Sequence, residues 1–363
     1  MPCDSIEHGK LTIIDNVGGK GVVEIAPRKL SYNPALVKLI SNSKRVYCVS
    51  RDSNIDGMGT PALLIRNYNM NPKNVFFMQQ KDFKMLLNRI KRLNPKECSF
   101  IIGDLSLNDD QILYAKETIS RLKKNRNIII WLDHHPWSGK GVKAISGIDF
   151  WVSGENELYS AAQLACVLLC KKNKENRMLS DMVHISDFAT KSKRFGGINE
   201  KLTGAIMSFR WKSKSMQSNL QRLSSIIARL DFNNSFVEKA YKSYLKASKR
   251  GIKILKSNTY VAAVSPYNIV VGFSKKLHTN QARSIMEERY KSDIEVYVDM
   301  ETGKSGTRSR KGADCSLIAS ALNGGGHPQA SGFAVDIKKY GSFGKSGKER
   351  LVGQIKRIAE KSY

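Results

Sequence analysis

Residues 128–136 read Ile-Ile-Ile-Trp-Leu-Asp-His-His-Pro, so that an apolar run ends in one carboxylate and two imidazoles. A short continuous apolar run predicts a strand buried on both faces, as in a parallel sheet covered by helices. Parallel sheets bind their ligands beyond the carboxyl ends of the strands. Because Asp and His are ligands of divalent metals, Asp133, His134 and His135 predict a metal site at the end of this strand.

A second string, Gly-Gly-Gly-His-Pro, occupies residues 324–328. Its three glycines offer backbone amides beside His327, an arrangement that suits a phosphate or another anion. Taken together, the two strings indicate metal-assisted chemistry on a phosphate ester.

Upstream of the first string, apolar strand-like runs alternate with segments of helical period. The predicted strands cover residues 45–50, 74–78, 99–104 and 127–132, and the predicted helices cover 57–68, 83–93 and 109–123. This alternation is typical of an α/β fold in which a parallel sheet carries helices on both faces. Residues 11–14 and 22–25, on either side of a Gly-Gly turn, predict a small hairpin.

The length of 363 residues favours two domains. We expect a metal-binding catalytic domain over residues 1–190, a basic helical connector over 191–256 and a smaller α/β domain over 257–363. The smaller domain has expected strands at 259–264, 269–273, 294–298 and 332–335, and expected helices at 281–289 and 314–322.

The formal net charge is +28, which favours a polyanionic partner such as nucleic acid. The alternative is a lysine-rich surface that binds nothing in particular. Within the connector, Arg210, Trp211, Lys212 and Lys214 combine charge with a ring that can stack on a base, as single-strand binding requires. The alternative for this stretch is a solvated helix face with a buried tryptophan.

The sequence contains no apolar stretch long enough for a membrane helix, and its first residues do not form a signal peptide. Its six cysteines form no CxxC pair, so we expect core thiols rather than a zinc site. These features predict a cytoplasmic protein without a membrane partner.

Further candidate ligands, four aspartates and one asparagine, follow the predicted strands or lie in a later helix. They are Asp52, Asn54 and Asp56 after the first strand, Asp104 after the third, and Asp187 in a helical stretch. Singly, Asp104 could be a turn residue and Asp187 a surface charge. Because parallel strand ends converge on one edge, the joint arrangement instead predicts one shared site. The count suits two metals, which need about six to eight ligands.

These motifs resemble the DHH phosphoesterase superfamily, and more narrowly the subfamily that joins a DHH domain to a DHH-associated domain. RecJ-type exonucleases, nanoRNases and cyclic-dinucleotide phosphodiesterases belong to that subfamily. The resemblance rests on Leu-Asp-His-His-Pro at 132–136 and Gly-Gly-Gly-His-Pro at 324–328, in that order, and covers about residues 44–190 and 258–340.

The resemblance implies a centre of two Mn²⁺ or Mg²⁺ ions, with Asp104 as the bridging ligand. The implied ligands are Asp52, Asn54, Asp56, Asp104, His134 and Asp187, and the implied catalytic residues are Asp133, His134 and His135. The family's first motif usually runs His-x-Asp-x-Asp-Gly. Here Asp52 stands in the place of its histidine and Asn54 in the place of its first aspartate, which weakens one of the two metal positions.

In the second domain, the resemblance implies a substrate-binding surface. Its implied members are Arg308, Ser309, Gly324, Gly325, Gly326 and His327. Arg308 would contact a substrate phosphate, and His327 would face the phosphate or nucleotide end.

The expected function is that of an exonuclease or oligoribonuclease, which hydrolyses single-stranded RNA or DNA to mononucleotides. One alternative is a phosphoesterase for cyclic dinucleotides or phosphoadenosine phosphate. The other is a catalytically weakened nucleic-acid-binding scaffold related to replication proteins, because of Asp52 and Asn54. The expected partners are single-stranded nucleic acid or short oligonucleotides, with a homodimer or a replication or repair partner as further candidates.

Overall fold

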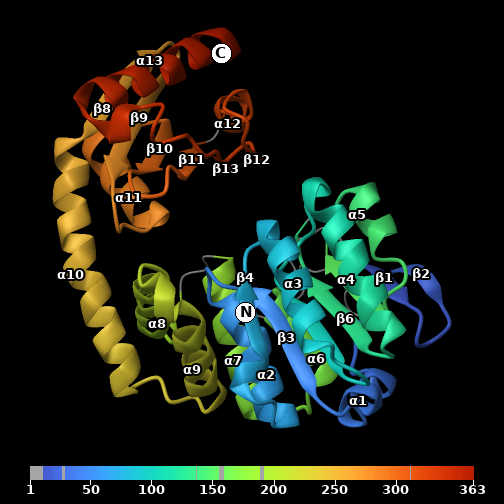
Figure 1. Ribbon diagram of the computed structural model, residues 1–363. Coiled ribbons are helices and arrows are strands. Elements are labelled where there is room, and N and C mark those ends of the chain that lie inside the picture. The colour runs from blue at the N-terminus through green and yellow to red at the C-terminus, as the bar shows by residue number, and fades with distance from the viewer. Residues whose placement is uncertain (1–10, 27–28, 136, 155–158, 189–191, 311) are drawn as a thin grey trace. The chain divides into compact units, whose positions relative to one another are not determined.

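The computed structural model describes residues 11–26, 29–135, 137–154, 159–188, 192–310 and 312–363; of His327 it describes the backbone alone. The chain forms two compact units, Met1–Tyr241 and Lys242–Tyr363 (Figure 1). Among the described helices, none is long and apolar enough to cross a membrane.

Unit 1 is built on a seven-stranded sheet with the strand order β2-β1-β7-β6-β5-β3-β4. The strands are β1 (Leu11–Asp15), β2 (Gly21–Ile25), β3 (Val46–Arg51), β4 (Val75–Met78), β5 (Ser99–Gly103), β6 (Ile128–Asp133) and β7 (Phe150–Gly154). Strands β3 to β7 pair in parallel, and the β1–β2 hairpin adds antiparallel strands beside β7. The predicted parallel sheet and the predicted hairpin are both confirmed.

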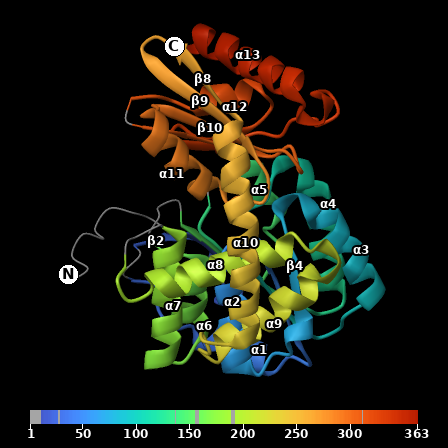
Figure 2. The same ribbon diagram turned by 90° about the vertical axis from the view of Figure 1, so that its left-hand side faces the viewer.

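Helices cover both faces of this sheet (Figures 1 and 2). They are α1 (Pro34–Ser41), α2 (Asp56–Tyr68), α3 (Phe83–Leu93), α4 (Ile112–Lys124), α5 (Gly139–Ala144), α6 (Ala161–Leu169), α7 (Lys174–Asp187), α8 (Gly196–Arg210) and α9 (Met216–Ala228). One apolar core joins the sheet to α1, α2 and α6 to α9, and a second joins it to α3, α4 and α5. The α/β class with two covered faces is therefore confirmed.

Helix α3 illustrates why these segments fold locally as they do. Its apolar residues Phe83, Leu86, Leu87 and Ile90 recur at helical spacing and are all buried, while its lysines and arginines stay on the other face. Asn94 ends the helix in the left-handed conformation, with φ of 42°. Such an amphipathic helix is stable because its apolar stripe packs on the sheet.

The strand order reverses between β3 and β5. From β3 the chain continues to β4 on one side, and then returns to place β5 on the other side of β3. In open parallel sheets, this reversal separates the loops that follow the two strands and leaves a crevice at their carboxyl ends. The loop after β3 and the loop after β5 hold Asp52, Asp56 and Asp104, so the topology itself brings the predicted acidic residues to one crevice.

Helices α8 and α9 lie within residues 191–256 and contribute Leu202, Phe209, Leu220 and Leu223 to the first core. The following helix, α10 (Ser235–Ser257), contains the boundary between the two units.

Unit 2 contains a six-stranded sheet with the strand order β12-β13-β11-β10-β9-β8. Its strands are β8 (Thr259–Val264), β9 (Tyr267–Ser274), β10 (Ile294–Asp299), β11 (Ser305–Ser309), β12 (Gly325–His327) and β13 (Ala330–Gly332). Helix α11 (Thr279–Tyr290) packs on one face, and α12 (Ser316–Ala321) and α13 (Lys345–Ser362) pack on the other. Figure 2 shows α13 beside β8.

The predicted strand over residues 332–335 is confirmed in part. Strand β13 ends at Gly332, and Ala334 bridges to Lys304 in the same antiparallel register. Bonds from the Ser305 amide to the Phe333 carbonyl and from the Val335 amide to the Gly303 carbonyl continue this register as far as residue 335.

Gly57, at the start of α2, is required by a close approach of two backbone segments. A Cβ atom there would lie 2.0 Å from the Arg51 carbonyl oxygen. We expect Gly57→Ala to destabilise the chain by about 1–3 kcal/mol, because such overlap forces the backbone to shift. Urea unfolding followed by circular dichroism measures the change.

Gly139, at the start of α5, provides the control, since no described atom would lie within 4 Å of a Cβ atom placed there. Gly139→Ala should leave the free energy of unfolding unchanged or raise it by up to about 1 kcal/mol. Equal losses in the two variants would contradict the close approach at Gly57.

Candidate metal centre

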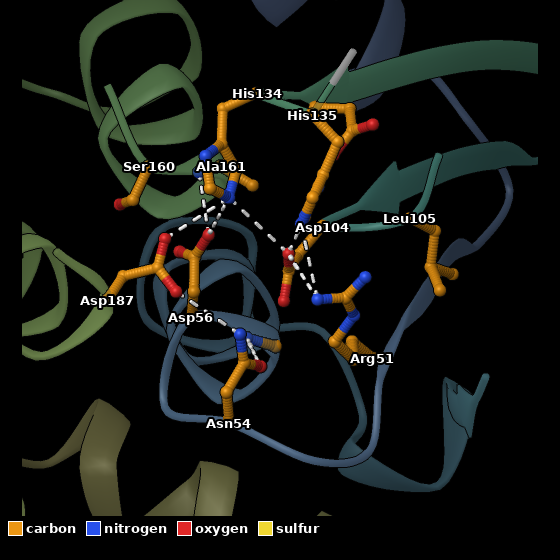
Figure 3. A network of polar contacts seen from close by, with 12 residues as sticks. Arg51, Asn54, Asp56, Asp104, Leu105, His134, His135, Ser160, Ala161 and Asp187 are labelled. Atoms are coloured by element: carbon orange, nitrogen blue, oxygen red, sulfur yellow. Dashed lines mark hydrogen bonds and ion pairs between the residues drawn. The ribbon is translucent and has the colours of Figure 1, made fainter. Parts of the chain in front are cut away.

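The candidate site lies at the carboxyl ends of β3, β5 and β6 (Figure 3). Asp56 is the first residue of α2, Asp104 follows β5, and His134 follows β6. Asp187 is the last residue of α7 and lies against the same crevice. Four residues that are far apart in the sequence therefore meet at one point.

His134 lies at the centre of this group. Its Nε2 atom is 3.1 Å from Asp187 Oδ2, 3.6 Å from Asp104 Oδ1 and 3.7 Å from Asp56 Oδ2. Asp56 and Asp104 are fully buried. Three carboxylates around one imidazole form a concentrated negative site away from bulk water.

Asp104 is held in an unfavourable conformation with unused oxygens. Its φ is 55°, in the left-handed region that side chains other than glycine seldom adopt. Among the described residues, neither of its carboxylate oxygens accepts a hydrogen bond. Backbone strain and an unsatisfied buried carboxylate are both costly, and they occur together at functional sites.

Asp56 has a different set of partners. Its two oxygens accept hydrogen bonds of 2.8 Å from the backbone amides of Ala161 and Ala162, in the first turn of α6. These bonds and the partial positive charge of the helix end orient the carboxylate toward His134.

Asp133 lies beside the centre and both of its oxygens are occupied. Its Oδ1 is 2.7 Å from His135 Nδ1, and its Oδ2 accepts a bond of 2.8 Å from Trp137 Nε1. Trp137 in turn packs edge-on between Trp131 and Trp151. Asp133 therefore orients His135, as a carboxylate behind a histidine commonly does.

The sequence analysis missed Arg51 and Trp137, which contact predicted site residues. Arg51 is the last residue of β3, and its Nη1 is 3.2 Å from His135 Nε2 and 3.8 Å from Asp104 Oδ1. A basic residue directly before an acidic loop was the available signal. For Trp137, which lies two residues beyond His135, no pattern in the sequence marked a role.

Asp52 and Asn54 lie next to the group around His134 and have other partners. Asp52 is buried, and its Oδ1 is 3.7 Å from Nε of Arg210. The Asn54 side chain accepts a 3.0 Å bond from the Gly57 amide and donates a 3.3 Å bond to Asp187 Oδ1. Asn54 thus holds the start of α2 and orients Asp187.

The charges of the group perturb one another strongly. Burial and the neighbouring Asp104 and Asp187 raise the pKa of Asp56 to about 8. Burial opposes a charged imidazole, but Asp104, Asp56 and Asp187 outweigh it and raise the pKa of His134 to about 10. Burial also disfavours ionised Asp104, yet Arg51 and the histidines lower its pKa. In the metal-free chain, protons on Asp56 and His134 therefore supply the positive charge that a bound cation would otherwise provide.

The residues present fit a divalent cation. Among the described residues, Asp56, His134 and Asp187 offer ligand atoms within 4.8 Å of one another, and so do Asp104, His134 and His135. Carboxylate oxygens and an imidazole nitrogen are ligands of Mn²⁺ and Mg²⁺ sites. The unused oxygens of Asp104 are the specific feature that a cation would satisfy.

The predicted basic stretch begins beside this centre. Arg210 ends α8 and is the residue that approaches Asp52. Lys212 and Lys214 follow it and are exposed, while Trp211 is half-buried. Exposed positive charge thus continues outward from the acidic loop after β3.

The predicted substrate-binding residues of unit 2 lie on neighbouring strands. Arg308 lies on β11 opposite Glu295 of β10 and Ala330 of β13. Gly325, Gly326 and the His327 backbone form the edge strand β12, whereas the His327 side chain lies outside the described part.

Ser309, Gly324 and Gly326 fix the conformation of the segment 324–328. Ser309 Oγ is 2.8 Å from the Pro328 and Ala313 carbonyl oxygens, so it holds the loop to β11. Gly326 has φ of 138°, and a Cβ atom at Gly324 would lie 2.2 Å from the Gly332 carbonyl oxygen. Both positions therefore need glycine for the fold of the loop itself.

No protein-family model matches the chain, and no curated protein matches it. Among solved structures, it is similar to an exopolyphosphatase-related protein from Bacteroides fragilis, with 16% identity over 89% of this chain and 97% of the other and a TM-score of 0.48. It is also similar to a pGpG-specific phosphodiesterase from Vibrio cholerae, with 14% identity, coverage of 86% and 99% and a TM-score of 0.47. An uncharacterized protein from Helicobacter pylori matches at 16% identity, with coverage of 87% and 99% and a TM-score of 0.38.

The raised pKa values predict how the stability of the metal-free chain depends on pH. A group whose pKa is higher in the folded chain stabilises the fold below its unfolded pKa, and this contribution is lost as the pH rises through the folded pKa. For Asp56 the loss runs from 3.8 to about 8, and for His134 from 6.5 to about 10. The metal-free chain should therefore lose stability as the solution becomes alkaline.

A cation that binds deprotonated ligands reverses this loss. We expect Mn²⁺ to raise the melting temperature relative to chelator, and to raise it more at about pH 8 than at about pH 6, because fewer protons compete at the higher pH. Differential scanning calorimetry measures both shifts. A gain that shrinks with rising pH, or one that survives Asp187→Asn, would contradict the placement of the cation among these residues.

Proposed function

We propose that the chain is a metal-dependent phosphoesterase of the DHH type that cleaves phosphodiester bonds in single-stranded nucleic acid or short oligonucleotides. The observation that carries this proposal is the convergence of Asp56, Asp104 and Asp187 on His134, with the oxygens of Asp104 unused. A buried carboxylate with a purely structural role would have hydrogen-bond partners, and the oxygens of Asp104 have none among the described residues.

In this proposal, Asp56, Asp104, His134 and Asp187 hold the divalent ion, Mn²⁺ or Mg²⁺. When bound, such an ion polarises a phosphoryl oxygen and lowers the pKa of a coordinated water toward neutrality. Arg51 keeps one-fifth of its side chain exposed and is placed to donate hydrogen bonds to an anion in the same crevice. The bond from Asp133 fixes the tautomer of His135 and so leaves the Nε2 of His135 to interact with Arg51.

Charge supports nucleic acid as the substrate class. The net charge of +28 exceeds what one small phosphate ester requires, and it favours a ligand with many phosphates. Arg210 ties the basic stretch to the acidic loop after β3, and the exposed Lys212 and Lys214 extend from it. A single strand that follows these lysines would reach the crevice of the metal centre.

The direct test is hydrolysis of end-labelled oligonucleotides of graded length, with Mn²⁺ or with chelator. Asp104→Asn keeps the size of the side chain and removes its charge, so we expect a loss of rate on the order of 10²–10³-fold, as when one charge-stabilising group is removed from an active site. Glu117→Gln, an exposed change on α4, is the matched control and should leave the rate unchanged.

Metal-independent cleavage, or full activity of Asp104→Asn, would refute the phosphoesterase assignment. Cleavage restricted to dinucleotides such as pGpG would support the alternative of a small-nucleotide phosphodiesterase. Binding of single strands with neither Mn²⁺ affinity nor hydrolysis would support the scaffold alternative.

The basic stretch makes a separate prediction about affinity. We expect the double variant Lys212→Glu and Lys214→Glu to bind single strands more weakly. The steepness of log affinity against log salt should fall by about 1 to 2, because fewer counterions are released when fewer phosphates are contacted. Fluorescence anisotropy with labelled single strands measures this.

The control is the double variant Lys96→Glu and Lys124→Glu, which makes the same change in charge. Both lysines are exposed and lie at the end of the sheet where β5 and β6 begin. This control should change the slope less than the Lys212 and Lys214 pair. The same change in both double variants would mean that affinity comes from overall charge and not from this stretch.

A further inference from the structure

We propose that the centre holds a single divalent ion and that the guanidinium of Arg51 takes the place of a second one. In this arrangement, Asp56, Asp104, His134 and Asp187 bind the ion, and Arg51 serves as the fixed cation between Asp104 and His135. The inference rests on the proposed function, since it specifies the metal centre of that same site.

The position of Arg51 is the first argument. Its Nη1 atom lies 3.8 Å from Asp104 Oδ1 and 3.2 Å from His135 Nε2, on the side of Asp104 that faces away from Asp187 (Figure 3). A second metal ion that shared Asp104 with the first and took His135 as a ligand would need this same space. A guanidinium supplies a positive charge there without any metal.

The hydrogen bonds of His135 are the second argument. Its Nδ1 lies 2.7 Å from Asp133 Oδ1, and the other oxygen of Asp133 accepts from Trp137. The carboxylate therefore holds the imidazole proton on Nδ1, and the lone pair on Nε2 faces Arg51. Although Asp104, His134 and His135 are close enough to form a ligand group, both nitrogens of His135 are engaged.

The loop after β3 is the third argument. Of the two residues that the first motif would supply to a second ion, Asp52 and Asn54, the second is engaged elsewhere. The Asn54 amide bonds to the Gly57 backbone and to Asp187, whereas Asp52 Oδ1 lies 3.7 Å from Arg210 and has no hydrogen-bond partner among the described residues. Asn54 is also uncharged, and a neutral amide is a weaker ligand than a carboxylate.

The test counts Mn²⁺ ions on the metal-free full chain by isothermal titration calorimetry and by elemental analysis after gel filtration. Electron paramagnetic resonance reports independently whether the bound ions are isolated or spin-coupled. We expect one ion per chain and an uncoupled Mn²⁺ signal. Two ions with a coupled signal would overturn the single-ion centre, and no ion at all would overturn the proposed function as well.

Variants then test Arg51 itself. Arg51→Ala removes the guanidinium and frees His135, so the Mn²⁺ count should rise from one to two per chain, whereas Arg51→Lys should keep it at one. Arg121→Ala removes an exposed arginine on α4 of the same unit and is the control, with an unchanged count. An Arg51→Ala chain that unfolds like the wild type and still binds one ion would overturn the assignment of this position to Arg51.

Discussion

The mutual repulsion of buried carboxylates around His134 is the constraint on which the rest of this structure depends. Asp56, Asp104 and Asp187 lie close together where water cannot screen them, and Asp104 has a strained backbone and no hydrogen bond from a described residue. Such an arrangement is unfavourable on its own and persists only when the surrounding fold over-determines it. A divalent cation would make the arrangement favourable, because these residues offer it the ligands that it needs.

Several parts of the fold hold these carboxylates in place. The first turn of α6 fixes Asp56 through two amides, and Asn54 holds both the start of α2 and Asp187. The reversal of strand order between β3 and β5 opens the crevice into which these elements point. Behind them, the packed Trp131, Trp137 and Trp151 side chains anchor Asp133 and, through it, His135.

Much of this could be predicted because the governing signals are local. The apolar run at 128–132 predicted β6, and its continuous hydrophobicity predicted cover on both faces. The acidic residues after predicted strands were expected to converge, and the structure brings Asp56, Asp104 and His134 together at the strand ends. Helix α13 was not predicted, although its buried residues Gly347, Leu351, Ile355 and Ala359 recur at helical spacing.

The sequence by itself determined the class of fold and the set of candidate ligands, because hydrophobic period and residue type are properties of short segments. The tertiary structure alone decided which side chains surround each candidate. Asp133 bonds to His135 and Trp137, Asp52 faces Arg210, and Arg51 lies beside Asp104. The physical reason is that a ligand's availability depends on its hydrogen-bond partners, and most of those partners come from positions that no local pattern connects.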